Sequence, residues 1–91
     1  MPFVKNHSPD TLKLAYGDAL RKFRDISGLS QMKVAAKAGI HFTYLGDVER
    51  GQRNIALVNI VRVARALDIP LDQFFAEVEA QLARYSHPTK K

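Results

Sequence analysis

Apolar side chains recur at helical spacing over the first third of the chain. One stripe has the i, i+4, i+8, i+11 spacing of a buried helical face and contains Leu12, Tyr16, Leu20, Phe23 and either Ile26 or Ser27. The preceding Ser8-Pro9-Asp10 provides an N-cap, a proline at the first helical position and an acid in the first turn. Because Gly28 follows the last apolar position, we expect a first helix over residues 10–27.

Residues 30–54 read SQMKVAAKAGIHFTYLGDVERGQRN and predict two short helices joined by a tight turn. Ser30 is a suitable N-cap for a helix over residues 31–38, and Gly39 ends that helix where the backbone must adopt a positive φ. A second helix is expected over residues 41–50, with Gly51 closing it. The inward-facing positions of the pair are Val34, Ala35, Ala38, Leu45 and Val48.

Two further helices follow this pair. A fourth is predicted over residues 57–67, with a core face made of Leu57, Ile60, Val61, Ala64 and Leu67. Pro70 disfavours helix in the residue before it, so the fourth helix ends there and a fifth spans residues 71–84. The expected fold is all-α with five helices: an N-terminal arm over residues 1–9, a domain over residues 10–84 and a flexible tail over residues 85–91.

The fifth helix carries more apolar surface than a small monomer needs. Leu71, Phe74 and Val78 are expected to face the core, which leaves Phe75 and Leu82 on an adjacent strip. An exposed apolar strip commonly marks a protein interface, so Phe75, Val78 and Leu82 are candidates for a homodimer interface. The alternative is that both strips are buried within one chain.

The composition of the chain is typical of a small intracellular protein. Its 91 residues suffice for one small domain, and the absence of cysteine excludes disulfides and cysteine-based zinc sites. No apolar run is long enough to span a membrane, and the N-terminus lacks the apolar core of a signal peptide. A cytoplasmic protein without metal or other cofactor is therefore expected.

Charge is distributed unevenly along the chain. Residues 1–67 hold eleven Lys and Arg against five Asp and Glu, whereas residues 68–84 hold one Arg against four Asp and Glu. The positive charge therefore accompanies the pair of short helices, and the fifth helix is acidic. This asymmetry suits a polyanionic partner on one face, although a solvated surface with a basic bias would give the same counts.

The pair of short helices resembles the helix-turn-helix of the lambda-repressor and Cro family of DNA-binding proteins. The matching features are Ser30-Gln31, Ala35, Gly39, the inward Leu45 and Val48, and the closing Glu49-Arg50-Gly51. The resemblance covers residues 16–75 and implies a double-stranded DNA partner, a two-fold operator and a homodimer. The residues from Thr43 to Asn54 look most like the controller proteins of restriction–modification systems, which control their own operon.

The second short helix is expected to lie in the major groove, where its N-terminal residues read bases. Its solvent side carries His41, Phe42, Thr43, Gly46, Asp47 and Arg50. Phe42 and Thr43 suit thymine methyl groups, and Asp47 suits a cytosine amino group, although Asp47 would equally form a salt bridge with Arg50 or Arg53. The family's usual arginine, glutamine or asparagine readers are absent from these positions. The operator sequence therefore cannot be predicted from them, and recognition is expected to depend more on DNA shape.

Phosphate contacts are expected around this helix. The candidates are Gln31, Lys33, His41, Tyr44, Arg53 and Asn54. The resemblance further implies that Arg24 and Glu49 pair as a structural brace. A glycine inside a helix lowers the stability of that helix, so Gly46 needs another reason to be there. We expect a close approach of its backbone to DNA or to a partner.

Other classes of function are less well matched. The sequence contains no phosphate-binding glycine loop, no cluster of metal ligands and no recognisable nucleophile with its base, so an enzyme is not expected. No small-molecule ligand is evident. Two alternatives stay open: an antitoxin that neutralises a partner toxin and binds DNA secondarily, and a helix-turn-helix fold that has lost DNA binding.

Overall fold

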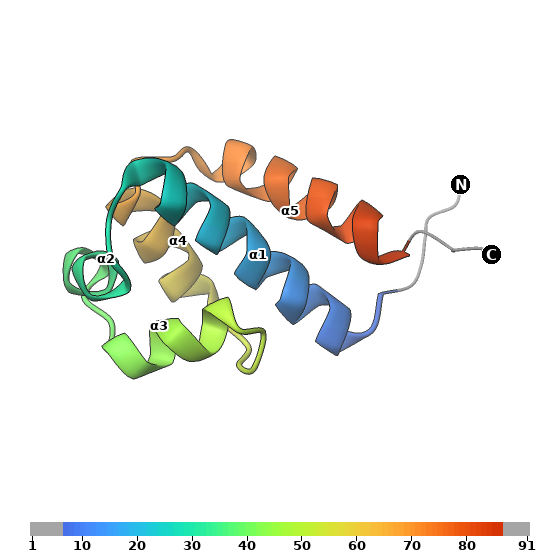
Figure 1. The fold of residues 1–91 in the computed structure, drawn as a ribbon, viewed down its shortest axis with the longest axis horizontal. Coiled ribbons are helices and arrows are strands. Elements are labelled where there is room, and N and C mark those ends of the chain that lie inside the picture. The colour runs from blue at the N-terminus through green and yellow to red at the C-terminus, as the bar shows by residue number, and fades with distance from the viewer. Residues whose placement is uncertain (1–6, 87–91) are drawn as a thin grey trace.

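The computed structural model describes residues 7–86, which form five helices and no strand (Figure 1). These are α1 (Pro9–Ser27), α2 (Gln31–Ala38), α3 (Phe42–Glu49), α4 (Leu57–Ala66) and α5 (Leu71–Ser86). The all-α expectation is confirmed. The predicted arm and tail fall largely on residues 1–6 and 87–91, outside the described part, while α1 already includes Pro9 and α5 continues to Ser86.

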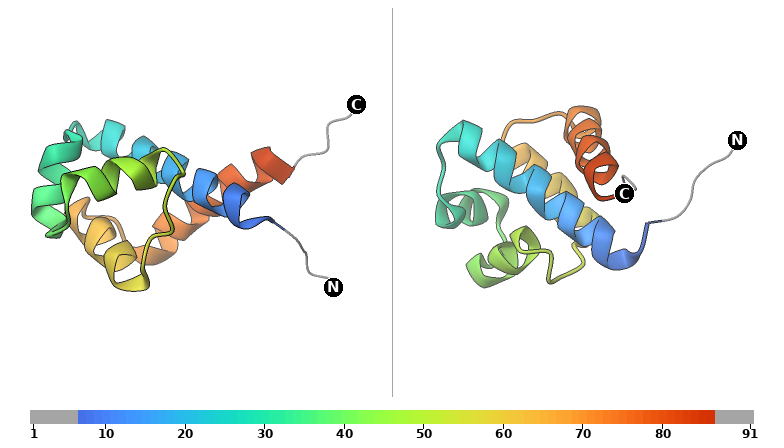
Figure 2. Two further views of the ribbon diagram at one scale, coloured as in Figure 1. Left: turned by 90° about the horizontal axis from the view of Figure 1, so that it is seen from below. Right: turned by 45° about the vertical axis from the view of Figure 1, so that its right-hand side comes forward.

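Helix α1 is the central element of the arrangement. It contacts α5 along one side and α3 on the other, while α2 contacts both α3 and α4. Figures 1 and 2 show α5 lying beside α1, with the short helices α2 and α3 at the opposite side of α1. The α2–α3 pair therefore sits at the surface, supported from behind by α1 and α4.

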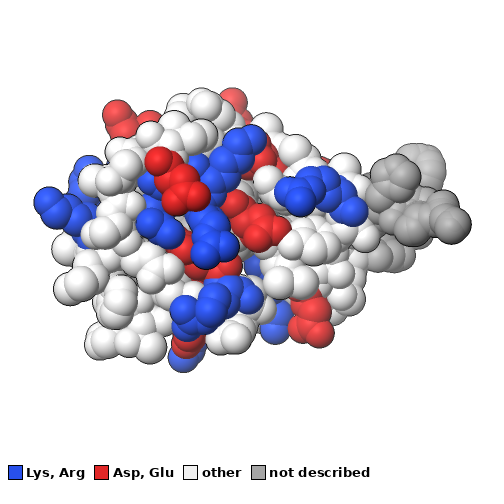
Figure 3. Space-filling model, viewed as in Figure 1, with Lys and Arg blue, Asp and Glu red and all other residues white. Residues whose placement is uncertain are grey.

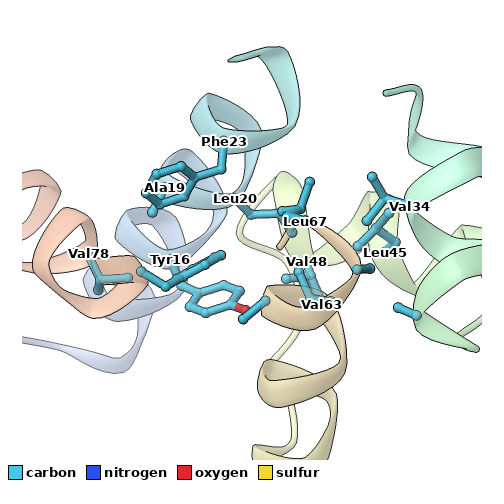
Figure 4. Packing of buried hydrophobic residues seen from close by; sticks show 14 of the residues in the cluster. Tyr16, Ala19, Leu20, Phe23, Val34, Leu45, Val48, Val63, Leu67 and Val78 are labelled. Carbon is cyan, nitrogen blue, oxygen red and sulfur yellow. The ribbon is translucent and has the colours of Figure 1, made fainter. Parts of the chain in front are cut away.

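The core takes side chains from all five helices (Figure 4). Phe74 of α5 is fully buried, and its ring centroid lies 5.1 Å from that of Tyr16 and 5.2 Å from that of Phe23. Aromatic pairs at these separations stabilise a core beyond the area they bury. The predicted inward positions Val34, Ala35, Ala38, Leu45 and Val48 are all buried.

Three predicted core residues are exposed instead. Leu12 is 45 % exposed, Ile26 71 % and Leu57 74 %. Each lies in the first or last turn of its helix, where the apolar stripe continues beyond the neighbouring helices that would cover it. Ala15, Ala19 and Val63, which the stripes did not include, are buried in their place.

The predicted apolar strip on α5 is largely used within the single chain. Val78 and Leu82 are each only 8 % exposed, because they pack in the core with Phe74. The helical pattern predicted that Leu82 lies on an exposed strip, but in the structure Leu82 is buried. Phe75 is 41 % exposed and is the member of the predicted dimer set that stays accessible.

Gly17 allows the closest approach between helices. A Cβ atom at this position would lie 2.5 Å from the carbonyl oxygen of Glu49 and 2.6 Å from that of Val48. Real Cβ atoms do not approach backbone oxygens so closely, so only glycine fits where α1 crosses the end of α3. Gly17 thereby fixes how deeply α3 sits against the domain.

None of the helices among residues 7–86 is both long enough and apolar enough to cross a membrane.

Candidate nucleic-acid interface

Local hydrogen bonds define the beginning and end of α2 and α3. The Ser30 hydroxyl accepts from the backbone N–H of Lys33 at 3.1 Å, and Gly39 ends α2 with a φ of 71°. The Nδ1 atom of His41 accepts from the backbone N–H of Thr43 at 3.2 Å and so caps α3. Because Nδ1 accepts, Nε2 is the ring nitrogen that is available to donate.

The solvent side of α3 matches the sequence-based expectation except at Gly46. His41, Phe42 and Thr43 are exposed, and Phe42 retains 46 % of its accessible surface. Gly46 is buried, because the guanidinium of Arg50 and the side chain of Gln31 lie next to it. Gly46 is therefore covered in the free protein, and the predicted approach of its backbone to DNA or to a partner stays a prediction.

A charged cluster joins three helices behind this surface. Glu49 accepts from Nε of Arg24 at 2.5 Å, from Nη2 of Arg24 at 3.1 Å and from Nε2 of Gln31 at 2.8 Å. The Glu49 side chain is 2 % exposed and that of Arg24 is 15 % exposed. The hydrogen bonds that Arg24 donates to Glu49 raise the pKa of Arg24 against the opposing effect of burial, so the guanidinium stays charged. We call Arg24, Gln31 and Glu49 the brace cluster.

A second network lies on the exposed side of α3. Asp47 pairs with Nη2 of Arg50 at 2.7 Å and with Nη2 of Arg53 at 3.7 Å. The guanidinium of Arg53 lies 5.4 Å from the centre of the Tyr44 ring, within range of a cation–π interaction. Both oxygens of Asp47 therefore have basic partners, which is the salt bridge that the sequence left open as its alternative role.

The remaining candidates differ in exposure. Tyr44 is half-buried, and its hydroxyl accepts from the backbone N–H of Ala56 and from Nδ2 of Asn59, each at 3.2 Å. The hydroxyl proton stays available to donate. Lys33 and Asn54 are exposed at the start of α2 and in the loop after α3.

The surface charge is mixed over the face that carries α1, α2 and α3. Figure 3 shows Lys and Arg side chains over the α2 end and along the α3 edge, with Asp and Glu side chains among them. The basic groups therefore form separate points, and no continuous positive stripe is visible on this face. Such an arrangement suits individual contacts to a polyanion rather than a uniform electrostatic attraction.

Sequence reasoning missed three contributions to this site. Gln31 was assigned to phosphate, but its amide also belongs to the brace cluster. Gly17 was not singled out, although a glycine inside a long helical pattern is a signal of close packing. For Arg50 the sequence predicts only a possible salt bridge with Asp47 and no contact with DNA, because the direction of a side chain is a tertiary feature.

Comparisons with known proteins agree with this geometry. A family model described as helix-turn-helix matches residues 20–74. The control protein C.MunI of a Mycoplasma species is 34 % identical over 71 residues, which cover 77 % of this chain and 96 % of that protein. The control protein C.BamHI of Bacillus amyloliquefaciens is 38 % identical over 61 residues, which cover 66 % of this chain and 75 % of that protein.

A solved structure extends the similarity to three dimensions. The crystal structure of the restriction-modification controller protein C.AhdI from Aeromonas hydrophila superposes with a TM-score of 0.67 at 46 % sequence identity. The match covers 69 % of this chain and 96 % of that chain.

Proposed function

The chain belongs to the helix-turn-helix family of DNA-binding transcriptional regulators that includes the restriction–modification control proteins, and we propose that it binds a two-fold operator as a homodimer and regulates its own gene. It acts through binding, without catalysis or a cofactor, in the cytoplasm. Family membership favours this function over an antitoxin. The observation that carries the proposal is an exposed α3 whose inner side is fixed by a buried charged cluster.

Helix α3 enters the major groove with its N-terminus first. Phe42 and Thr43 are the exposed residues at that end, and both suit contacts with thymine methyl groups, while the Thr43 hydroxyl adds a hydrogen bond. Asp47 is held by two arginines, which favours a role in positioning those arginines over acceptance from cytosine.

The phosphate contacts surround α3. Lys33, Arg53 and Asn54 are exposed, and Tyr44 and His41 each retain a donor after their internal hydrogen bonds. Gln31 lies in the first turn of α2, where free backbone N–H groups favour an anion, and the brace cluster fixes its side chain. These contacts position the protein on the duplex and carry little sequence information.

The dimer surface is centred on Phe75. This side chain lines a shallow pocket together with Leu12, Ile55 and Val78, close to Arg53 and Asn54 of the loop after α3. Leu12 and Phe75 are both more than two-fifths exposed, so they offer apolar area that a second copy would bury. A dimer formed there would place two copies of α3 in a fixed relation, as a two-fold operator requires.

A fluorescence-anisotropy titration on DNA from upstream of the protein's own gene tests this function. Random competitor DNA is present in excess, and the titration is repeated at several salt concentrations. We expect tight binding that survives the competitor, with two protein chains per two-fold site. Weak binding that competitor and salt abolish would contradict the proposal, and a stable complex with a protein encoded by the neighbouring gene would point to the antitoxin alternative.

A further inference from the structure

The middle of the exposed side of α3 is occupied by Arg50. At 3.6 residues per turn, Thr43, Gly46, Asp47 and Arg50 fall on the same side of the helix, opposite the buried Leu45 and Val48. Long side chains on a helix lean toward its N-terminus, so a residue at the C-terminal end covers the turn before it. Arg50 therefore brings its charged group back toward the part of α3 that meets base edges.

Gly46 provides the space for this arrangement. A Cβ atom at position 46 would lie 3.3 Å from Nη1 and 3.6 Å from Nη2 of Arg50. It would also lie 3.6 Å from Oε1 of Gln31. The guanidinium thus lies directly over the backbone of the glycine. A glycine in the middle of a short helix, which is otherwise unfavourable, has here a specific neighbour that uses the space.

Asp47 holds the guanidinium in place without using up its donors. Only Nη2 of Arg50 is paired with Asp47, at 2.7 Å. A guanidinium carries five N–H donors, so hydrogens on Nη1 and Nη2 remain to form two parallel bonds. The Arg50 side chain is 55 % exposed, and those donors have access to the solvent side of α3.

We propose that Arg50 is a base-reading residue, which donates two hydrogen bonds to O6 and N7 of a guanine in the major groove, and that Asp47 and Gly46 position its guanidinium. The inference rests on the proposed function and adds to it one guanine in each half-site. Arginine paired bidentately with guanine is the commonest specific contact in the major groove. The arginine reader absent from the N-terminal positions of α3 is thereby supplied from its C-terminal end.

A contact from Arg50 to phosphate is the competing reading, and sequence selection separates the two. Random-sequence selection of binding sites is carried out with the wild type and with Arg50→Ala, Arg50→Lys, Asp47→Asn and Gly46→Ala. Arg21→Ala is the charge-matched control, because Arg21 is an exposed arginine that faces α5 from α1, away from α3. Melting temperatures of all variants are recorded alongside.

For Arg50→Ala we expect the preference for guanine at one position in each half-site to vanish, with a loss of roughly ten- to a hundredfold on the preferred site and little change on sites without that guanine. Arg50→Lys keeps the charge and should still lose most of the preference, since lysine lacks the paired donors. Asp47→Asn should weaken the same preference. Gly46→Ala should lower it too while raising the melting temperature, because a new Cβ displaces the guanidinium but improves the helix.

An equal loss on all sequences for Arg50→Ala, or an unchanged base preference, would overturn the assignment of Arg50 and leave the proposed function standing. A wild type that selects no sequence would overturn both. Arg21→Ala should reproduce the wild-type preference, so a change in that control would also contradict a specific role for Arg50.

Discussion

Gly17 and Gly46 both lie inside helices, but the atoms next to them differ in how easily they can move. A Cβ at position 17 meets two backbone oxygens within 2.6 Å, and these cannot move without shifting the end of α3. A Cβ at position 46 meets the far end of a flexible arginine side chain at 3.3 Å. The same substitution should therefore have opposite effects on stability at the two positions.

We expect Gly17→Ala to lower the free energy of unfolding by about 2–3 kcal/mol, as overpacking against rigid atoms does. Gly46→Ala should raise it by about 0.5–1 kcal/mol, because alanine has the higher helix propensity. Urea denaturation of both variants measures the difference. Equal effects at the two sites would contradict the close crossing of α1 and α3.

Thr43 and Arg53 are expected to act on DNA in different ways. Arg53→Ala removes a proposed phosphate contact, so binding should weaken on every sequence and the slope of log affinity against log salt should fall by about 1. Thr43→Ala should instead change affinity at one or two base positions. Titrations on a panel of single-base operator variants at several salt concentrations test both, and an equal loss on every sequence for Thr43→Ala would exclude it as a base reader.

At the scale of elements, the brace cluster connects α1, α2 and α3 through Glu49. Removing one member of a buried charged pair leaves the other charge without compensation. Glu49→Ala should therefore lower the free energy of unfolding by about 3 kcal/mol, measured by urea denaturation. The double variant Arg24→Met with Glu49→Met should recover much of that loss. If the losses of stability caused by the two single substitutions simply add up in the double variant, Arg24 and Glu49 are not a coupled pair.

A different ion pair joins α1 and α5, between Lys22 and Glu77 at 3.1 Å. Burial alone would raise the pKa of Glu77, but hydrogen bonds from Gln81 and Lys22 outweigh it and lower the pKa below its ordinary 4.5. A carboxyl group whose pKa is lowered by folding stabilises the native state above the unfolded pKa and loses that contribution as the pH falls through the folded pKa.

We expect Glu77→Gln to reduce the free energy of unfolding by about 0.5–1 kcal/mol at neutral pH, as for a partly exposed pair. The difference from the wild type should begin to shrink near pH 4.5 and disappear in stronger acid. Denaturation curves across this pH range provide the measurement. A difference that stays constant in acid would show that the charge of Glu77 does not contribute.

At the scale of the whole molecule, the exposed apolar area of α1 and α5 is what a second copy would cover. Phe75→Glu places a charge in that area and should convert the proposed dimer to a monomer, which sedimentation or light scattering would detect as a halved mass. Ala80→Glu adds the same charge on the opposite side of α5 and should leave the dimer intact. A dimer that survives Phe75→Glu would place the interface elsewhere.

Local signals in the sequence were enough to predict the five helices and the inner face of the α2–α3 pair. Caps, glycines and apolar periodicity are local signals, so Ser30, Gly39, Leu45 and Val48 could be assigned without knowing any neighbour. Other features follow only from the packing of the helices, because burial and side-chain direction depend on what lies across the helix. It exposed Leu12 and Leu57, buried Leu82, and placed the Arg50 guanidinium over Gly46.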